Sequence, residues 1–221
     1  MFSHWDGALR MCPNRSKSGS QSEDDFNCHS DLSEALSRTR PSWNEYFMLM
    51  AKLCATRSTC YSRPVGAVIA RDKRILATGY NGAPPGSWHC TDRQECFWRE
   101  PQNQIPGIEP RDLSRAIHAE MNAVAYAARY GIHINGSTLY CTLSPCVHCF
   151  KTLISAGIVE VYFEHIYDFN DRGGDKALLA YYEQYADLIQ VKQLSISETS
   201  LEIAGRFLQW ITSSRRHEHY S

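Results

Sequence analysis

The chain has 221 residues, of which 43% are hydrophobic and 21% are charged, and its formal net charge is −1. This composition is typical of a soluble globular protein with enough chain for one domain and extensions. Because 23 Lys and Arg nearly balance 24 Asp and Glu, we expect no nucleic acid as a partner. No apolar run reaches the roughly 18–20 residues of a membrane span, and no secretory signal is recognisable, so we expect a cytoplasmic protein without a membrane partner.

Three segments of the chain differ in composition and pattern. Residues 1–40 are rich in Ser, mix charges and have no sustained hydrophobic period, which predicts a disordered N-terminal tail. Periodic apolar residues then begin near Ser42 and predict one folded domain over 41–193. Residues 194–221 are expected to form a C-terminal helical extension.

The folded domain is predicted to begin with a helix and a hairpin. Ser42 and Glu45 have the spacing of a capping box, and the apolar residues after them predict an amphipathic helix over 42–56. Two apolar runs within 65–79, separated by four polar residues, predict a β-hairpin. The Gly- and Pro-rich stretch 80–115 follows, and a loop of this length is usually functional or held by something such as a metal.

The second half of the domain alternates helices with strands. Helices are predicted at 117–130, 145–156, 176–185 and 198–211, and strands at 138–142, 158–163 and 188–193. This alternation implies right-handed crossovers between parallel strands, whereas the early hairpin adds an antiparallel edge. The expected fold class is therefore α/β, a three-layer α-β-α domain with a mixed sheet of about five strands.

Two predicted helices begin with metal-binding residue types. His118 opens the first, and Cys146 and Cys149 open the second after one intervening strand. Both helix N-termini should emerge at the same edge of the sheet, so the three side chains are expected to meet. One imidazole and two thiolates leave a fourth tetrahedral position for water, which is typical of a catalytic zinc. A structural zinc with a fourth protein ligand is the alternative.

Glu120 is the predicted catalytic group. It lies two residues after His118, where it can hydrogen-bond a water ligand of the metal instead of binding the metal itself. Zinc makes such a water acidic enough to supply a nucleophile near neutral pH. Glu120 can then carry a proton from the water to a ring nitrogen and on to the leaving amine. The complete pattern H-x-E…P-C-x-x-C is the established signature of zinc-dependent nucleobase deaminases.

The chain resembles the deoxycytidylate (dCMP) deaminases, above all the phage-type and bacterial late-competence enzymes. The likeness covers about 42–193 and rests on the two metal motifs and four further segments: SWNEYFM from Ser42, RSTC from Arg57, VGAVI from Val65 and GYNG from Gly79. It implies a cytidine-deaminase-like fold and zinc-dependent hydrolysis of dCMP to dUMP for dTMP synthesis. It also implies a homo-oligomer, often a hexamer, with dCTP and dTTP, together with Mg²⁺, as allosteric effectors.

The resemblance also implies substrate-binding roles. Asn81 would hold the deoxyribose, Ala67 would contact the base or sugar, and Tyr167 would line the base pocket. The spacing around Tyr167 differs from that of the family by about one residue. The phosphate must meet cationic or N–H groups. Three arginines near the appropriate segments stay open as candidates: Arg57, Arg63 and Arg115.

A second, structural zinc is implied by the same resemblance. Its ligands would include Cys60, Cys90 and Cys96, which lie in or beside the long irregular stretch. The cysteine that late-competence enzymes have just before the HAE helix is absent, and His89 or Asp112 would complete the site. Three ordinary reduced thiols are the alternative.

Three other functions remain open at this point. A tRNA adenosine deaminase shares both metal motifs, and a polynucleotide cytidine deaminase would need a basic channel with aromatic stacking surfaces. A catalytically idle zinc protein that binds dNTPs is the third alternative. Glu120 argues against an idle protein, because a scaffold has no use for that carboxylate beside the metal.

Overall fold

The computed structural model describes residues 40–108, 113–166 and 174–214. Within them, Pro41–Ala204 forms one compact unit, which contains every element discussed below except the end of the last helix. The predicted tail 1–40 and the end of the predicted extension lie almost entirely outside the described residues. Among the described residues, no helix combines the length and the apolar character that crossing a bilayer requires.

The first helix, α2 (Trp43–Ala55), begins with the predicted capping box. The Ser42 hydroxyl accepts a hydrogen bond from the Glu45 N–H at 3.2 Å, and the Glu45 carboxylate accepts one from the Ser42 N–H at 2.9 Å. Two otherwise unpaired N–H groups are thereby satisfied. The helix packs on the sheet through its buried residues Phe47, Met48 and Ala51.

The five strands of the described residues form one mixed sheet, as predicted. They are β1 (Gly66–Arg71), β2 (Arg74–Tyr80), β3 (Ser137–Leu143), β4 (Ile158–His165) and β5 (Gln190–Gln193). Their order is β2-β1-β3-β4-β5, with β1 antiparallel to both neighbours and β3, β4 and β5 parallel. The hairpin turns through Asp72 and Lys73, which both have positive φ, at 51° and 60°. This backbone suits the twist of a two-residue hairpin.

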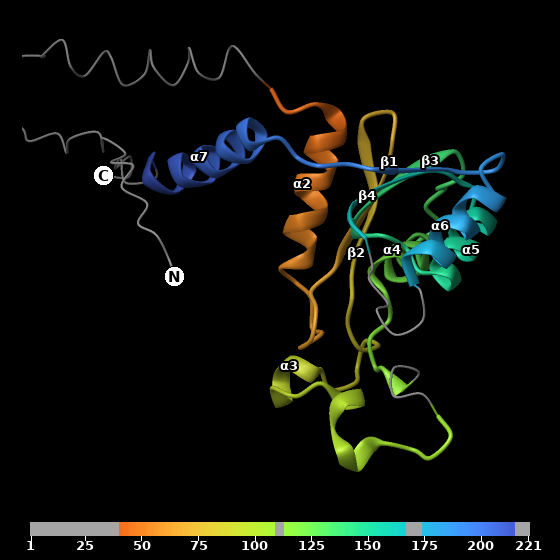
Figure 1. The fold of residues 1–221 in the computed structure, drawn as a ribbon. Coiled ribbons are helices and arrows are strands. Elements are labelled where there is room, and N and C mark those ends of the chain that lie inside the picture. The colour runs from red at the N-terminus through yellow and green to blue at the C-terminus, as the bar shows by residue number, and fades with distance from the viewer. Residues whose placement is uncertain (1–39, 109–112, 167–173, 215–221) are drawn as a thin grey trace, which may run out of the picture. The chain divides into compact units, whose positions relative to one another are not determined.

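Helices cover both faces of the sheet (Figure 1). One face carries α2. The other carries α4 (Ala119–Arg129), α5 (Val147–Ser155) and α6 (Gly174–Gln184), while α7 (Glu198–Ser214) follows β5. Successive β1 residues therefore enter different cores, Val68 beneath α2 and Ile69 beneath α4 and α5, and both are fully buried. The predicted three-layer α/β fold is confirmed.

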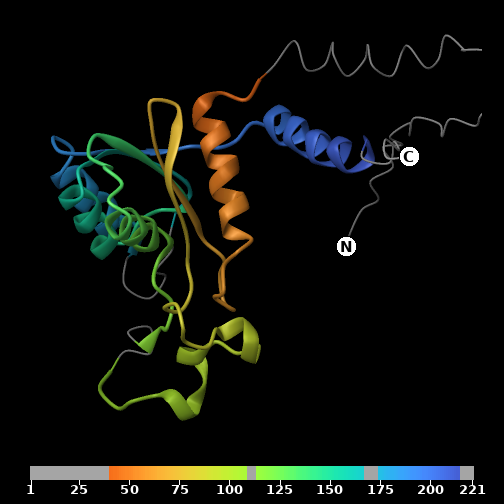
Figure 2. The ribbon, with the colours of Figure 1, turned by 180° about the vertical axis from the view of Figure 1, so that it is seen from behind.

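In its described part, the long stretch between β2 and α4 contains a short helix, α3 (Cys90–Arg93), and the 3₁₀ turns Phe97–Arg99 and Pro101–Asn103. Figure 2 places this yellow-green segment beyond the end of the sheet. Its two ends meet in an antiparallel bridge, where Gly82 and Ile117 exchange N–H···O bonds of 3.2 and 2.8 Å. Because Ile117 belongs to this bridge, α4 begins two residues later than predicted and His118 becomes its N-cap.

Candidate metal centre

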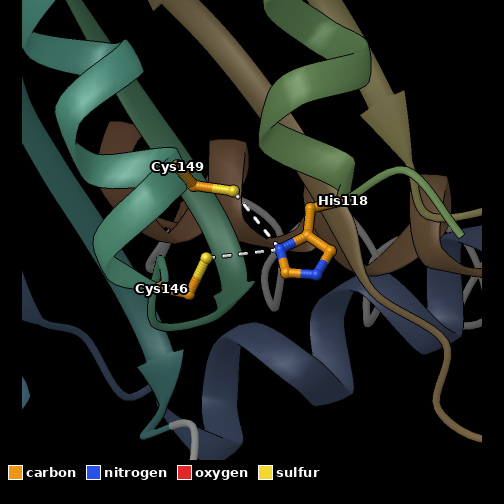
Figure 3. Close-up of side chains that lie close together, drawn as sticks. All are labelled: His118, Cys146 and Cys149. Atoms are coloured by element: carbon orange, nitrogen blue, oxygen red, sulfur yellow. Dashed lines mark hydrogen bonds between the residues drawn. The ribbon is translucent and has the colours of Figure 1, made fainter. Parts of the chain in front are cut away.

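Two helix N-termini bring the predicted ligands together. His118 is the N-cap residue of α4, Cys146 is the N-cap residue of α5, and Cys149 lies in the first turn of α5. The His118 side chain makes no capping bond to its own helix, whereas Cys146 is hydrogen-bonded by Cys149 in the first turn of α5. In Figure 3 the two thiols point at the same ring nitrogen of His118.

The spacing of the three ligand atoms fits zinc. His118 Nδ1 lies 3.5 Å from Cys146 Sγ and 3.3 Å from Cys149 Sγ. A tetrahedral zinc with ordinary bond lengths separates a nitrogen ligand from a sulfur ligand by about 3.5 Å. Among the described residues, no other group of three ligand atoms lies within 4.8 Å of one another. The protein therefore offers three ligands, which leaves one tetrahedral position for water or substrate.

The electrostatics of the cluster favour a bound cation. The hydrogen bond from the Cys149 thiol lowers the pKa of Cys146 to about 4, against the effect of burial, and His118 lowers it further. The same hydrogen bond raises the pKa of Cys149, and Cys146 in turn raises the pKa of His118. Cys146 is consequently a thiolate at neutral pH, the form that binds metals.

Glu120 lies next to the ligands in the first turn of α4 and is only 4% exposed. Burial raises the pKa of this carboxyl to about 7, although the positive charge of His118 opposes the rise. A buried carboxyl with a near-neutral pKa can both take up and release a proton at physiological pH. Its position beside an open metal site is the arrangement expected of a proton shuttle.

Tyr182 of α6 supports the metal centre, although no sequence motif marks it. Its hydroxyl donates a short hydrogen bond to the carbonyl of Pro145, the residue directly before Cys146. Its ring lies 4.6 Å from that of Phe150, between centroids, and the side chain is buried. The helical pattern predicted α6, but no local signal connects Tyr182 with a turn 37 residues earlier.

Asn81 is buried, and its side chain hydrogen-bonds to the segment just before β1. Its side-chain oxygen accepts hydrogen bonds from Ser58 Oγ at 2.6 Å and from the Val65 N–H at 2.8 Å, and its Nδ2 donates to the Arg63 carbonyl at 2.8 Å. An amide offers two donors and two acceptor positions. One N–H therefore remains for a ligand, while the other three positions tie the loop before β1 to the end of β2.

The other predicted substrate contacts are less visible. Ala67 is fully buried in the main core cluster, and Tyr167 lies outside the described residues. Among the arginines, Arg57 is exposed just after α2, and the carbonyl of Arg63 binds Asn81. Arg115 lines a hollow next to the start of α4.

The cysteines predicted to hold a second zinc lie in one neighbourhood. Burial raises the pKa of Cys96, and the nearby thiols of Cys60 and Cys90 raise it further. Their ligand atoms do not gather as closely as those of the first centre within the described part of the chain. The Nδ1 atom of His89 is shielded from solvent and has no hydrogen-bond partner among the described residues, which do not include Asp112.

Residues 41–165, more than half of the chain, match the model of the cytidine and deoxycytidylate deaminase zinc-binding region. This chain belongs to that family. The ComE operon protein 2 of Bacillus subtilis is 42% identical over 128 residues, which are 58% of this chain and 62% of that protein. The deoxycytidylate deaminase of Mycobacterium phage D29 is 37% identical over 129 residues, 57% of this chain and 96% of the phage protein.

A solved structure supports the same assignment. The dCMP deaminase of cyanophage S-TIM5, crystallised with dCMP and dUMP, superposes with a TM-score of 0.52 at 28% identity, over 71% of this chain and the whole of that one. The alignment with the Bacillus relative covers less than two thirds of that protein's length. The family confirms zinc as the metal that suits this centre.

Proposed function

We propose that this protein is an enzyme that hydrolyses dCMP to dUMP and ammonia, and so supplies dUMP for dTMP synthesis. One observation carries the proposal: a three-ligand zinc site that leaves one position open, with a buried carboxyl of near-neutral pKa beside it. The substrate is proposed from the relatives, because the phage D29 protein is named a deoxycytidylate deaminase and the cyanophage enzyme was crystallised with dCMP and dUMP.

His118, Cys146 and Cys149 would hold the zinc. Bound there, zinc would make a water ligand acidic enough to serve as the nucleophile near neutral pH. The protein contributes a preformed ligand geometry, because both helix N-termini and the intervening strand β3 are fixed by the buried core. The positive ends of α4 and α5 also favour the thiolate charge.

Glu120 would move the protons. As a carboxylate it takes one proton from the attacking water and gives it to N3 of the cytosine ring. It then passes the second proton to the exocyclic nitrogen, which leaves C4 as ammonia. A pKa of about 7 suits both directions of transfer. Because Glu120 is almost fully buried, bulk water does not compete with this exchange.

We also propose roles for the predicted substrate-binding residues and for the second cysteine cluster. The one unfilled N–H of Asn81 would donate to the deoxyribose, and Ala67 and Tyr167 would border the base. A second zinc at Cys60, Cys90 and Cys96 would fix the long segment between β2 and α4. Two zinc ions per chain in the purified protein would support that second site, and one would exclude it.

We further propose a domain over 41–193 with a tail and a helical extension, a homo-oligomeric enzyme such as a hexamer, and allosteric control by dCTP and dTTP with Mg²⁺. Cytoplasmic location is proposed because all seven cysteines among the described residues are unpaired, as expected in a reducing compartment. Light scattering and dCMP kinetics with each nucleotide would test the assembly and its regulation.

A substrate panel tests the function. Ammonia release would be followed with dCMP, deoxycytidine, CMP, single-stranded DNA and a tRNA anticodon stem-loop, each with and without dCTP. We expect turnover of dCMP well above the others. A zinc-loaded sample that releases no ammonia from dCMP but releases it from a polymer would favour a polynucleotide deaminase. Silence on every substrate would favour an idle binding protein.

A further inference from the structure

A hollow of about 390 Å³ lies beside the start of α4 and has no role in the metal centre. It is lined by Pro84, Ser87, Ser114, Arg115, Ala116 and Ile117. Ile117 forms the bridge with Gly82, and the next residue is the metal ligand His118. Three residues of extended chain span at most about 11 Å, so Arg115 lies within the length of a small ligand from the metal centre.

Aromatic rings hold Arg115 in place without neutralising its charge. The guanidinium carbon lies 3.9 Å from the ring centroid of Trp88 and 5.6 Å from that of Phe97. Its Nη2 makes one long hydrogen bond, of 3.5 Å, to the Trp88 carbonyl. Its Nε is shielded from solvent and meets no acceptor in the described part of the chain. No carboxylate of the described residues lies within 4.0 Å of this cation.

Arg93 provides a comparison within the same structure. Its guanidinium carbon lies 3.8 Å from the ring centroid of the same Trp88. However, its Nη1 is 3.9 Å from the Glu95 carboxylate, and its side chain is 55% exposed. Two cations therefore share one indole, but within 40–108, 113–166 and 174–214 only Arg93 has a carboxylate nearby. An anion in the hollow would stabilise the positive charge of Arg115.

We propose that Arg115 binds the 5′-phosphate of the nucleotide and thereby makes the enzyme selective for a nucleoside monophosphate over a nucleoside. This inference rests on the proposed function and assigns one of its substrate contacts. A planar guanidinium can bond two oxygens of one phosphate, and stacking on Trp88 fixes its orientation in advance. Ser114 adds a donor, because its Oγ accepts from the Ala116 N–H at 3.3 Å and keeps its own O–H for a ligand.

The test compares two substrates that differ only in the phosphate. Arg115→Gln should lower kcat/KM for dCMP about 100-fold or more, since a charge-assisted pair is lost, and should change kcat/KM for deoxycytidine less than about threefold. Inorganic phosphate should inhibit the wild type in competition with dCMP, and its inhibition constant should rise at least about tenfold in the variant. Arg93→Gln is the matched control, because it removes a cation from the same indole; it should leave both measurements unchanged.

The outcomes separate this inference from the function on which it rests. If Arg115→Gln lowers kcat/KM equally for dCMP and deoxycytidine, Arg115 has a structural role and the inference is overturned. If the variant keeps both the wild-type ratio of the two kcat/KM values and the wild-type inhibition by phosphate, the inference is overturned as well. In both cases wild-type turnover of dCMP would leave the proposed function intact. A zinc-loaded wild type that does not act on dCMP would overturn both. Unfolding curves of both variants would verify that each is folded.

Discussion

Gly79→Ala should disturb the active site from the sheet beneath it. Gly79 lies on β2, where a Cβ atom would approach the Ala119 carbonyl oxygen to 2.1 Å, the Ala123 nitrogen to 2.7 Å and the Ala123 Cβ to 3.1 Å. These are mostly backbone atoms of α4, so no flexible side chain can move aside. Real Cβ contacts essentially never fall below 3.0 Å, and relief therefore requires the helix and strand to separate by at least about 0.9 Å.

The cost of this separation can be estimated for both stability and activity. Overpacking of a core commonly destabilises a protein by about 1–3 kcal/mol. Ala119 stands between His118 and Glu120, so the start of α4 moves with the contact. A displacement of about 1 Å at a catalytic group can lower turnover about 100-fold. We therefore expect Gly79→Ala to lower the free energy of unfolding by about 1–3 kcal/mol and to lower kcat/KM with dCMP about 100-fold.

Urea unfolding and dCMP kinetics on the same samples would measure both effects. Gly205→Ala in α7 is the control, because no atom of the described residues lies within 4 Å of its added Cβ. That change should keep full activity and should stabilise the helix by about 0.5–1 kcal/mol. Wild-type stability and turnover in Gly79→Ala would refute the claim that this close approach positions α4.

Three further changes test other parts of the account. Burial alone would raise the pKa of Glu45, but hydrogen bonds, led by that of the Ser197 hydroxyl, lower it to about 2. The ionised carboxylate therefore stabilises the fold fully above pH 4.5, and this stabilisation is lost as the pH falls towards 2. Glu45→Gln should thus cost about 1–2 kcal/mol at neutral pH, after allowance for solvent screening, and this cost should vanish as the pH falls through 2 in unfolding titrations. Tyr182→Phe leaves the Pro145 carbonyl without its hydrogen-bond donor and should lower the free energy of unfolding by about 1–3 kcal/mol. Zinc should also pass faster from the variant to a chromogenic chelator. An unchanged rate of zinc loss would refute the claim that Tyr182 positions Cys146. Removing zinc with a chelator should lower the midpoint of thermal unfolding, and added zinc should restore it, because a metal that binds only the folded state stabilises it.

The main features of the fold follow from local sequence patterns. The capping box at Ser42, the helical apolar period and the alternating strands predicted the helices and the mixed sheet. The exact start of α4 did not follow, because it depends on the bridge between Gly82 and Ile117, which are 35 positions apart. Local patterns do not encode such a pairing, since its partner lies at the other end of a long loop.

The metal centre was predictable because its spacing carries the chemistry. His118, Cys146 and Cys149 each lie at a helix start, and the order of helix and strand places these starts together. The support from Tyr182 and the aromatic setting of Arg115 were not predictable in this way. Both depend on side chains that meet only after folding, and neither position has a motif of its own.

Replacement of one carboxyl tests the central claim most directly. Zinc content and dCMP turnover would be measured on the same preparations of the wild type and Glu120→Gln. We predict that both proteins bind zinc equally and unfold alike, while the variant loses at least about 10²–10⁴-fold in kcat, the usual contribution of a general acid–base group. A fully zinc-loaded Glu120→Gln protein that still releases ammonia from dCMP at the wild-type rate would contradict the account.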